Sequence, residues 1–162
     1  MPPRAPKQAP LVIGWNEYVD IPEWGIQRLR AKVDTGARSS ALHVENLREL
    51  PRDQVEFVVV LHRRKRDRRV HVRTRISRRG RVRSSNGEYS NRIFVTVPIS
   101  IGPVEREIEL SLVDRQKMIH RMLLGRTALS GPFLVDVAHR CLLTRQRPPQ
   151  TKARPRKRPQ LS

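Results

Sequence analysis

The tripeptide Asp34-Thr35-Gly36 carries the side chain best placed to do chemistry in this sequence. It follows residues 29–33, where apolar and basic residues alternate as they do in a half-buried strand. The Asp34 and Thr35 side chains can bond the local backbone, and Gly36 can adopt the positive φ that a tight turn often requires. A carboxylate held at the end of a strand in this way is suited to act as an acid or a base. The same tripeptide is also a common structural turn, so the rest of the chain has to decide between the two.

Peptide hydrolysis by carboxylates needs two of them. Two neighbouring carboxylates cannot both ionise, so they share a proton: one accepts a proton from water while the other donates to the carbonyl oxygen. Asp34 heads the one Asp-Thr-Gly of the chain, and neither Asp114 nor Asp136 is followed by Thr-Gly. An active pair therefore requires two copies of Asp34, which a symmetric dimer brings together at its two-fold axis. We predict that the active form is a homodimer.

Two blocks of the chain resemble the retropepsin pattern. Residues 31–37 read Ala-Lys-Val-Asp-Thr-Gly-Ala, and residues 122–129 read Met-Leu-Leu-Gly-Arg-Thr-Ala-Leu. The retropepsin pattern has Asp-Thr/Ser-Gly-Ala and, later in the chain, two apolar residues and a glycine just before a short helix. Together with residues 11–15 and 38–43, these blocks more closely resemble one bacterial family, the RimK-associated retropepsin-like proteases, also named ATP-dependent zinc proteases. The resemblance covers roughly residues 11–144.

The resemblance implies an all-β, retropepsin-like closed barrel (the acid protease fold) with one short helix near the C-terminus. It implies that Asp34 is the catalytic acid and base, that Gly36 belongs to the same catalytic turn, and that Thr35 braces the paired turns of a dimer. It also implies that Gly125 lets a second backbone segment pass close behind the Asp34 loop. The residues that support the site structurally are, by the same resemblance, Ala37, Leu124, Gly125 and Arg126.

The sequence gives a weaker signal for a flap that would cover the site. Viral retropepsins have a glycine-rich flap, and no such segment is evident in this sequence. Asn86-Gly87 is nevertheless the strongest short-range signal for a β-hairpin. The candidate flap is therefore the hairpin of residues 81–92, with Asn86 and Gly87 at its turn.

Substrate and partners follow from the same resemblance. Some relatives are linked to RimK, an ATP-grasp ligase that adds glutamates to the C-terminus of a ribosomal protein, and are thought to trim such tails. The expected function is therefore that of an aspartic-type peptidase acting on peptide or protein substrates, with glutamate-modified tails as candidates. The alternative is a catalytically silent β-barrel module that docks on an ATP-grasp ligase, the ribosome or RNA through basic segments.

The net charge of +19 gathers in three segments, residues 1–10, 63–83 and 145–162. The remainder is almost neutral, which favours a globular core with cationic attachments over a nucleic-acid-binding fold. We expect a disordered arm over residues 1–10, one domain over residues 11–144 and a disordered, Pro-rich tail over residues 145–162. Residues 63–83 contain no aromatic side chain, so any contact with RNA would be unspecific.

Neither zinc nor ATP is expected, despite the family's second name. The sequence has no His-Glu-x-x-His and no Gly-x-x-x-x-Gly-Lys phosphate loop, and its five histidines are scattered. Cys141 is the one cysteine, so no intrachain disulfide can form and a reducing compartment is the simplest expectation. Residues 1–10 lack the apolar region of a signal peptide, and no apolar run reaches membrane-spanning length. We expect a cytoplasmic protein that binds no metal, cofactor or membrane.

The alternation of apolar and polar residues also predicts the elements that position the site. Strands are expected over residues 11–19, 29–34, 39–44, 55–62, 70–77, 93–101, 104–113, 133–137 and 141–143. The first two are expected to pair as a hairpin, and residues 47–54 to form a connector. Residues 126–129 are expected to form one helical turn that ends at Gly131-Pro132, while residues 114–124 stay open.

Overall fold

The computed structural model describes residues 8–62, 64–65, 67–84, 86–114 and 120–145, and strands dominate them. The strands are β1 (Leu11–Ile13), β2 (Asn16–Ile21), β3 (Ile26–Val33), β4 (Ser40–His43), β5 (Glu45–Leu50), β6 (Gln54–Val60), β7 (Arg69–Arg75), β8 (Arg78–Arg83), β9 (Tyr89–Ile101), β10 (Val104–Val113), β11 (Met122–Leu124) and β12 (Phe133–Val135). A 3₁₀ turn, η1 (Pro22–Trp24), joins β2 to β3, and one short helix, α1 (Arg126–Leu129), precedes β12. The expected all-β fold with one short helix near the C-terminus is confirmed.

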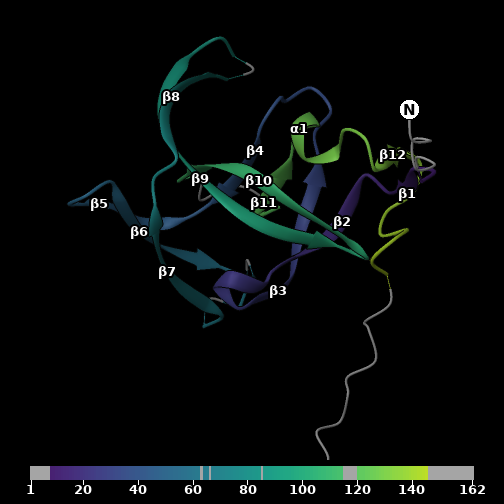
Figure 1. The fold of residues 1–162 in the computed structure, drawn as a ribbon, viewed down its shortest axis with the longest axis horizontal. Helices are drawn as coiled ribbons and strands as arrows, with labels where there is room; N and C mark the ends of the chain where they lie inside the picture. The colour runs from purple at the N-terminus through teal and green to yellow at the C-terminus, as the bar shows by residue number, and fades with distance from the viewer. Residues whose placement is uncertain (1–7, 63, 66, 85, 115–119, 146–162) are drawn as a thin grey trace, which may run out of the picture.

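The largest sheet closes on itself (Figure 1). Its strand order is β10-β4-β11-β3-β2-β9-β8, and a further pairing joins β9 back to β10. Six strands therefore form a ring, which agrees with the expected closed barrel, while β8 extends from the first half of β9 as an outer strand. The strands β2 and β3 are antiparallel neighbours, so the predicted hairpin is present.

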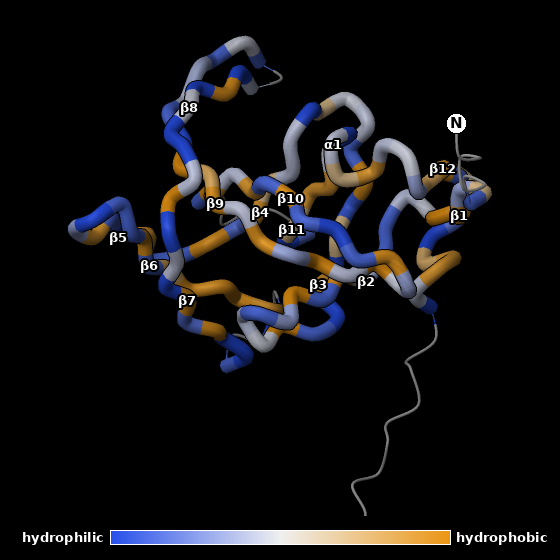
Figure 2. The backbone as a smooth tube through the Cα atoms, in the orientation of Figure 1, coloured by the Kyte–Doolittle hydropathy of each residue, from blue (hydrophilic) through white to orange (hydrophobic). Residues whose placement is uncertain are grey.

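The core lies among the strands of this ring. Alternating apolar residues turn inward, as in β10, where Leu110 is fully buried while Glu107 and Glu109 remain partly or fully accessible. Figure 2 shows the hydrophobic residues gathered along the strands of the body, whereas the projecting ends near β5 and β8 are mostly hydrophilic. The buried cluster includes Leu29, Ala31, Leu42, Val95, Val97, Ile99, Leu112, Met122 and Leu124.

The short strand β11 decides where the site forms. It lies between β3, with which it runs parallel, and β4, with which it runs antiparallel. Leu124 is paired with Val33 in this ladder, so the end of β11 meets the end of β3. A segment from late in the chain is thereby inserted beside the residue that directly follows β3, Asp34.

A second sheet is formed by β5, β6 and β7. The prediction of a connector over residues 47–54 is wrong for most of its length, because β5 extends to Leu50 and pairs antiparallel with β6. Its side chains are largely exposed and show no apolar alternation, so the usual sequence signal of a strand is missing. The pairing is instead supported by an ion pair between Arg48 and Glu56.

The expected strand over residues 11–19 is two strands in two different sheets. β1 pairs in parallel with β12, whereas β2 joins the ring. The break occurs at Gly14, where a Cβ would lie 2.6 Å from the Cα of Arg140, so the backbone of residues 139–140 passes directly over it. Residues 141–143 form no strand either, because their backbone is bonded to the side chain of Glu17.

Glu17 is fully buried and binds the C-terminal segment with both carboxylate oxygens. Oε1 accepts the backbone N–H groups of Leu143 and Thr144 and the Thr144 hydroxyl at 2.8–3.0 Å. Oε2 accepts the N–H groups of Gly14 and Leu142 at 2.8 and 2.9 Å. A buried carboxylate is tolerated only with such compensation.

Other predicted elements agree with the structure at or near their expected bounds, notably β9, β10 and α1. The predicted disordered arm and tail fall mostly on residues 1–7 and 146–162, outside the described residues. Among the helices of the described part, none has the length and apolar character needed to cross a membrane.

Candidate active site

Asp34 leaves β3 with a half-buried carboxylate that is held by its own turn. The N–H of Gly36 donates to Asp34 Oδ1 at 3.1 Å, and the N–H of Ala37 donates to the Asp34 carbonyl oxygen at 3.3 Å. Gly36 does not use the positive φ that is open to a glycine, since it lies outside the left-handed region. A Cβ on Gly36 would lie 3.3 Å from Asp34 Oδ1, so a side chain there would press on the carboxylate.

The end of β11 fixes the backbone of this turn. The N–H of Asp34 donates to the Leu124 carbonyl oxygen at 2.8 Å, which extends the parallel ladder by one residue. One residue past Gly125, the N–H of Arg126 donates to the Ala37 carbonyl oxygen at 2.9 Å. The loop is therefore held at both its start and its end by the segment that leads into α1.

Gly125 lies where the two segments come closest. A Cβ at this position would be 2.4 Å from the Ser39 carbonyl oxygen, well inside van der Waals contact. Its N–H donates to Ser40 Oγ at 3.0 Å in a buried hydrogen bond. Ser40 was not singled out from the sequence, although a serine followed by Ala-Leu at the start of a buried strand is a signal that its hydroxyl needs a partner.

The side chain of Arg126 reaches the exposed part of the turn. Its Nη1 donates to the Thr35 carbonyl oxygen at 3.0 Å. Thr35 and Gly36 themselves are exposed. All seven residues that the sequence suggested for the site and its support thus belong to one contiguous structure, made from the β3–β4 loop and the β11–α1 junction. Their catalytic roles stay predictions.

The chain brings no second carboxylate to Asp34 among the residues that the structure describes. Asp114 is exposed just after β10. Asp136 is occupied elsewhere: its Oδ2 lies 2.8 Å from His139 Nδ1, and its Oδ1 accepts the Ala138 N–H at 2.9 Å. These two hydrogen bonds, the one with His139 first, hold the pKa of Asp136 below its usual value. Within the described residues, neither Asp114 nor Asp136 is therefore hydrogen-bonded to the Asp34 turn.

The candidate flap is a real hairpin made of β8 and the first residues of β9. The Ser84 N–H donates to the Glu88 carbonyl oxygen at 2.7 Å, and the Gly87 N–H donates to the Ser84 carbonyl oxygen at 2.9 Å. Gly87 has a φ of 87°, which explains the glycine, but the connection is longer than a two-residue Asn-Gly turn because the strands end at Arg83 and Tyr89. The hairpin rises on the same side of the molecule as the β3–β4 loop and α1 (Figure 1).

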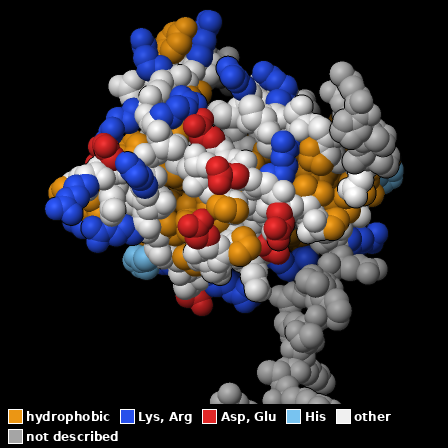
Figure 3. All heavy atoms as spheres, viewed as in Figure 1, with side chains coloured by type: hydrophobic (Ala, Val, Ile, Leu, Met, Phe, Trp, Pro, Cys, Tyr) orange, Lys and Arg blue, Asp and Glu red, His pale blue; other side chains and the backbone are white. Residues whose placement is uncertain are grey.

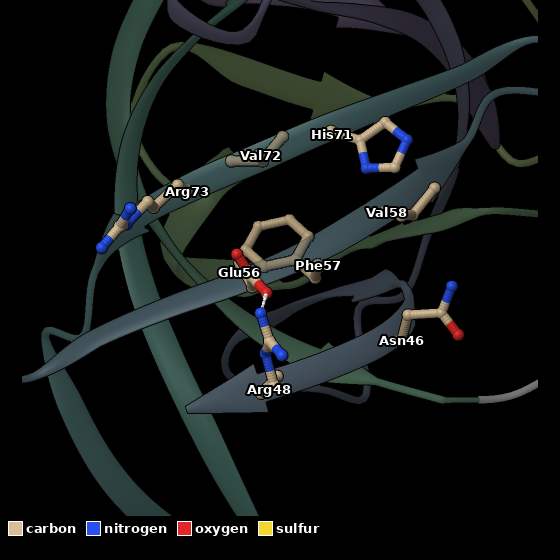
Figure 4. Close-up of a pocket in the computed structure, with 8 residues that line it drawn as sticks. All are labelled: Asn46, Arg48, Glu56, Phe57, Val58, His71, Val72 and Arg73. Carbon is tan, nitrogen blue, oxygen red and sulfur yellow. Dashed lines mark hydrogen bonds and ion pairs between the residues drawn. The ribbon is translucent and has the colours of Figure 1, made fainter. Parts of the chain in front are cut away.

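A pocket of about 450 Å³ lies away from this loop, on the β5–β6–β7 sheet (Figure 4). Two of its charged lining residues, Arg48 and Glu56, are bonded to each other. None of the residues assigned to the site lines it: the lining residues are Asn46, Arg48, Glu56, Phe57, Val58, His71, Val72 and Arg73. No group of three potential metal ligands gathers within the described ranges.

Known proteins are similar to this chain over most of its length. The chain is 36% identical over 138 residues to a protein of Shewanella halifaxensis named "Probable alpha-L-glutamate ligase", covering 83% of this chain and 30% of that protein. A protein of the same name from Desulfotalea psychrophila is 34% identical over 135 residues, which cover 82% of this chain and 29% of the relative. The chain thus spans less than a third of the length of these curated relatives.

A solved structure has the same fold. The protein Lpg0085 of Legionella pneumophila, described as having unknown function, superimposes with a TM-score of 0.67 at 25% identity, covering 82% of this chain and 98% of its own. The profile of one family, described as "Retropepsin-like aspartic endopeptidase RimB", matches residues 12–146. Since that match contains the Asp34 loop, β11 and α1, the chain belongs to the RimB-like family of retropepsin-like aspartic endopeptidases.

Proposed function

We propose that the protein is an aspartic-type peptidase in which the Asp34 carboxylate activates a water molecule. The observation that carries the proposal is the way Asp34 is held: its backbone is bonded to Leu124 and its Oδ1 to the Gly36 N–H. A carboxylate with a fixed orientation at the rim of an exposed loop can present one oxygen to a water. Membership of a family named for aspartic endopeptidases supports the same reaction.

The proposed catalyst is a homodimer, because a single chain supplies one carboxylate. Two copies of Asp34 facing each other across a two-fold axis would share one proton. The ionised copy takes a proton from water, and the protonated copy donates to the oxygen of the scissile carbonyl. The resulting tetrahedral intermediate then collapses as the C–N bond breaks and a proton passes to the leaving nitrogen. The exposed Thr35 and Gly36 would lie at this axis.

The proposed substrate is a protein tail that carries added glutamates, and the proposed partner is the ATP-grasp ligase that adds them. Two observations support this choice. The curated relatives are named as glutamate ligases, so a region like this chain occurs in proteins named for adding glutamate. The chain is also strongly cationic, with a net charge of +19, which favours encounter with an acidic substrate.

The test compares the wild type with Asp34→Asn, which keeps the size of the side chain but cannot supply the carboxylate. Hydrolysis of a peptide with a glutamate tail is followed by mass spectrometry, and the oligomeric state of both proteins by sedimentation equilibrium. We expect cleavage by the wild-type dimer and a loss of at least about a thousandfold in Asp34→Asn. Cleavage that survives the substitution, or a chain that stays monomeric while active, would rule the mechanism out.

A second candidate function is a non-catalytic docking module for the ligase. The relatives favour it, because the matched region makes up less than a third of proteins that are named only as ligases. This function predicts that the Asp34→Asn protein binds the ligase as tightly as the wild type and that neither cleaves any glutamate-tailed peptide. Cleavage by the wild type alone decides for the peptidase.

A further inference from the structure

We propose that Arg81 and Arg83 of β8 form a binding site for the carboxylates of an extended acidic peptide, and that this site selects acidic substrates. The inference deepens the proposed function, on which its relevance to cleavage rests. Binding of an acidic peptide can be measured without cleavage, so the binding site and the peptidase activity can be tested separately.

These two arginines differ from the other two of β8 in having no carboxylate to neutralise them. Arg78 is ion-paired with Glu109, and Arg79 with Glu49 and Asp53. Arg81 and Arg83 are exposed, and neither is ion-paired to a carboxylate in the part of the chain that the structure describes. Their charge is therefore available to a ligand.

The guanidinium groups are also preorganised by an aromatic ring. That of Arg81 lies 4.7 Å from the centroid of Tyr89, and that of Arg83 lies 5.8 Å from the same centroid. Stacking occupies the faces of the guanidinium planes and leaves their N–H groups free to bind carboxylates in a fork. Tyr89 is itself 58% exposed, so it is no part of the core. Ordering both side chains before binding reduces the entropy lost on binding.

The strand that carries them is a free edge. β8 pairs with β9 along one side, and its other side makes no backbone hydrogen bond within the described residues. Its base is anchored where Arg78 stacks 3.7 Å over the Phe94 ring, so the edge is presented by a fixed strand. Arg81 and Arg83 lie on the same face, about 7 Å apart along the strand as alternate residues are. A peptide that adds to this edge as a further strand places alternate side chains at the same spacing.

The same geometry favours a peptide over a nucleic acid. A nucleic acid backbone cannot extend a β-sheet through its edge, and a stacking platform for bases needs an aromatic face that is open. The ring of Tyr89 is already engaged by two guanidinium groups. Figure 3 shows basic side chains on both sides of a hydrophobic one at the projecting end of the hairpin, on the side where the β3–β4 loop also rises in Figure 1.

The experiment measures binding of a fluorescein-labelled oligoglutamate peptide to the full chain by anisotropy, with oligoglutamine of equal length as the reference probe. The test variant is Arg81→Gln with Arg83→Gln. The matched control, Arg64→Gln with Lys65→Gln, removes the same charge from another exposed basic segment. We expect the dissociation constant for oligoglutamate to rise about tenfold in the test variant and by less than about twofold in the control. Equal losses in the two variants, or no loss in either, would overturn the proposal.

A labelled oligouridylate tests the alternative occupant in the same assay. If the hairpin variant loses RNA binding and keeps oligoglutamate binding, the surface serves nucleic acid and the proposal is wrong. Binding that depends on Arg81 and Arg83 in a protein that cleaves nothing supports the site and contradicts the peptidase. Cleavage of the glutamate-tailed peptide with an unchanged KM in the hairpin variant supports the peptidase and contradicts the site.

Discussion

The hydroxyl of Ser40 accepts the backbone N–H of Gly125 at 3.0 Å, in a buried contact between residues 85 positions apart. Ser40 begins β4, which follows the Asp34 loop, and Gly125 directly follows β11, so this bond joins the end of the loop to the end of β11. Because Gly125 has no side chain, its segment can pass this close to the backbone of Ser39. The Ser40 hydroxyl thus adds a side-chain bond to the backbone hydrogen bonds that already tie this loop to the β11–α1 segment.

Replacing Ser40 with alanine leaves the Gly125 N–H buried without its acceptor. We expect the free energy of unfolding to fall by about 1–3 kcal/mol, the usual cost of an unsatisfied buried donor. Chemical denaturation followed by circular dichroism measures the change, with Ser130→Ala as the control because Ser130 is exposed. A stability equal to that of the control variant would show that the hydrogen bond contributes nothing.

Replacing Glu17 with glutamine turns an oxygen that accepts hydrogen bonds into an amide that faces backbone donors. We expect a loss of about 3 kcal/mol in the free energy of unfolding, because a buried acceptor of several N–H groups is removed. Residues 139–144 should also become sensitive to limited proteolysis, since this carboxylate binds them to the body. The exposed Glu23→Gln is the matched control. Unchanged protease resistance in Glu17→Gln would contradict the assigned role.

The pair formed by Asp136 and His139 predicts a pH effect with a defined sign. Its hydrogen bonds lower the pKa of Asp136, so its contribution to stability is present above the pKa of the unfolded state and is lost as pH falls through the lower pKa of the folded state. In His139→Ala, the pKa of Asp136 should rise toward its ordinary value, remaining slightly lowered by the Ala138 N–H. Titration of the carboxyl carbon by NMR measures it. A midpoint that does not move would remove His139 as the cause.

If the catalytic pair is shared between subunits, mixing the wild type with Asp34→Asn should lower the activity. If each active dimer uses one Asp34 from each subunit, adding excess Asp34→Asn protein to the wild type converts active dimers into mixed ones with a single carboxylate. Activity per wild-type chain should then fall severalfold, after time for subunit exchange. Activity is read by the peptide assay, with the Arg64→Gln, Lys65→Gln variant at the same excess as a control that still carries Asp34. Constant activity per wild-type chain would mean that each subunit acts alone.

The parts of the site that could be predicted are those with a local signature. Asp34-Thr35-Gly36 and Leu124-Gly125-Arg126 are short motifs, and the resemblance of both to one family pattern indicated that they meet. Ser40 and Glu17 escaped prediction because their partners lie 85 and up to 127 residues away, and no local pattern encodes such a contact.

The strands, too, could be predicted only where a local pattern marks them. Alternating β10 was predicted to its last residue, because one face of it is core. β5 was missed, since neither of its faces is buried enough to leave an alternating pattern. The division between β1 and β2 was missed as well, because it depends on residues 139–140 passing over Gly14. Apolar alternation predicts a strand only where one face of it is buried. It gives no prediction for an exposed strand such as β5, or for a break that a distant segment causes.

The insertion of β11 between β3 and β4 has a consequence for how the protein matures. During synthesis Asp34 emerges early, but the strand that fixes its loop, Leu124 included, is among the last parts of the domain to leave the ribosome. Contacts this far apart in sequence form late, because closing the intervening loop costs entropy before any contact repays it. A nascent chain therefore carries the Asp34 carboxylate in an unformed loop until residues 122–126 have been synthesised. The proposed peptidase would accordingly be inactive while this part of the chain is still being made.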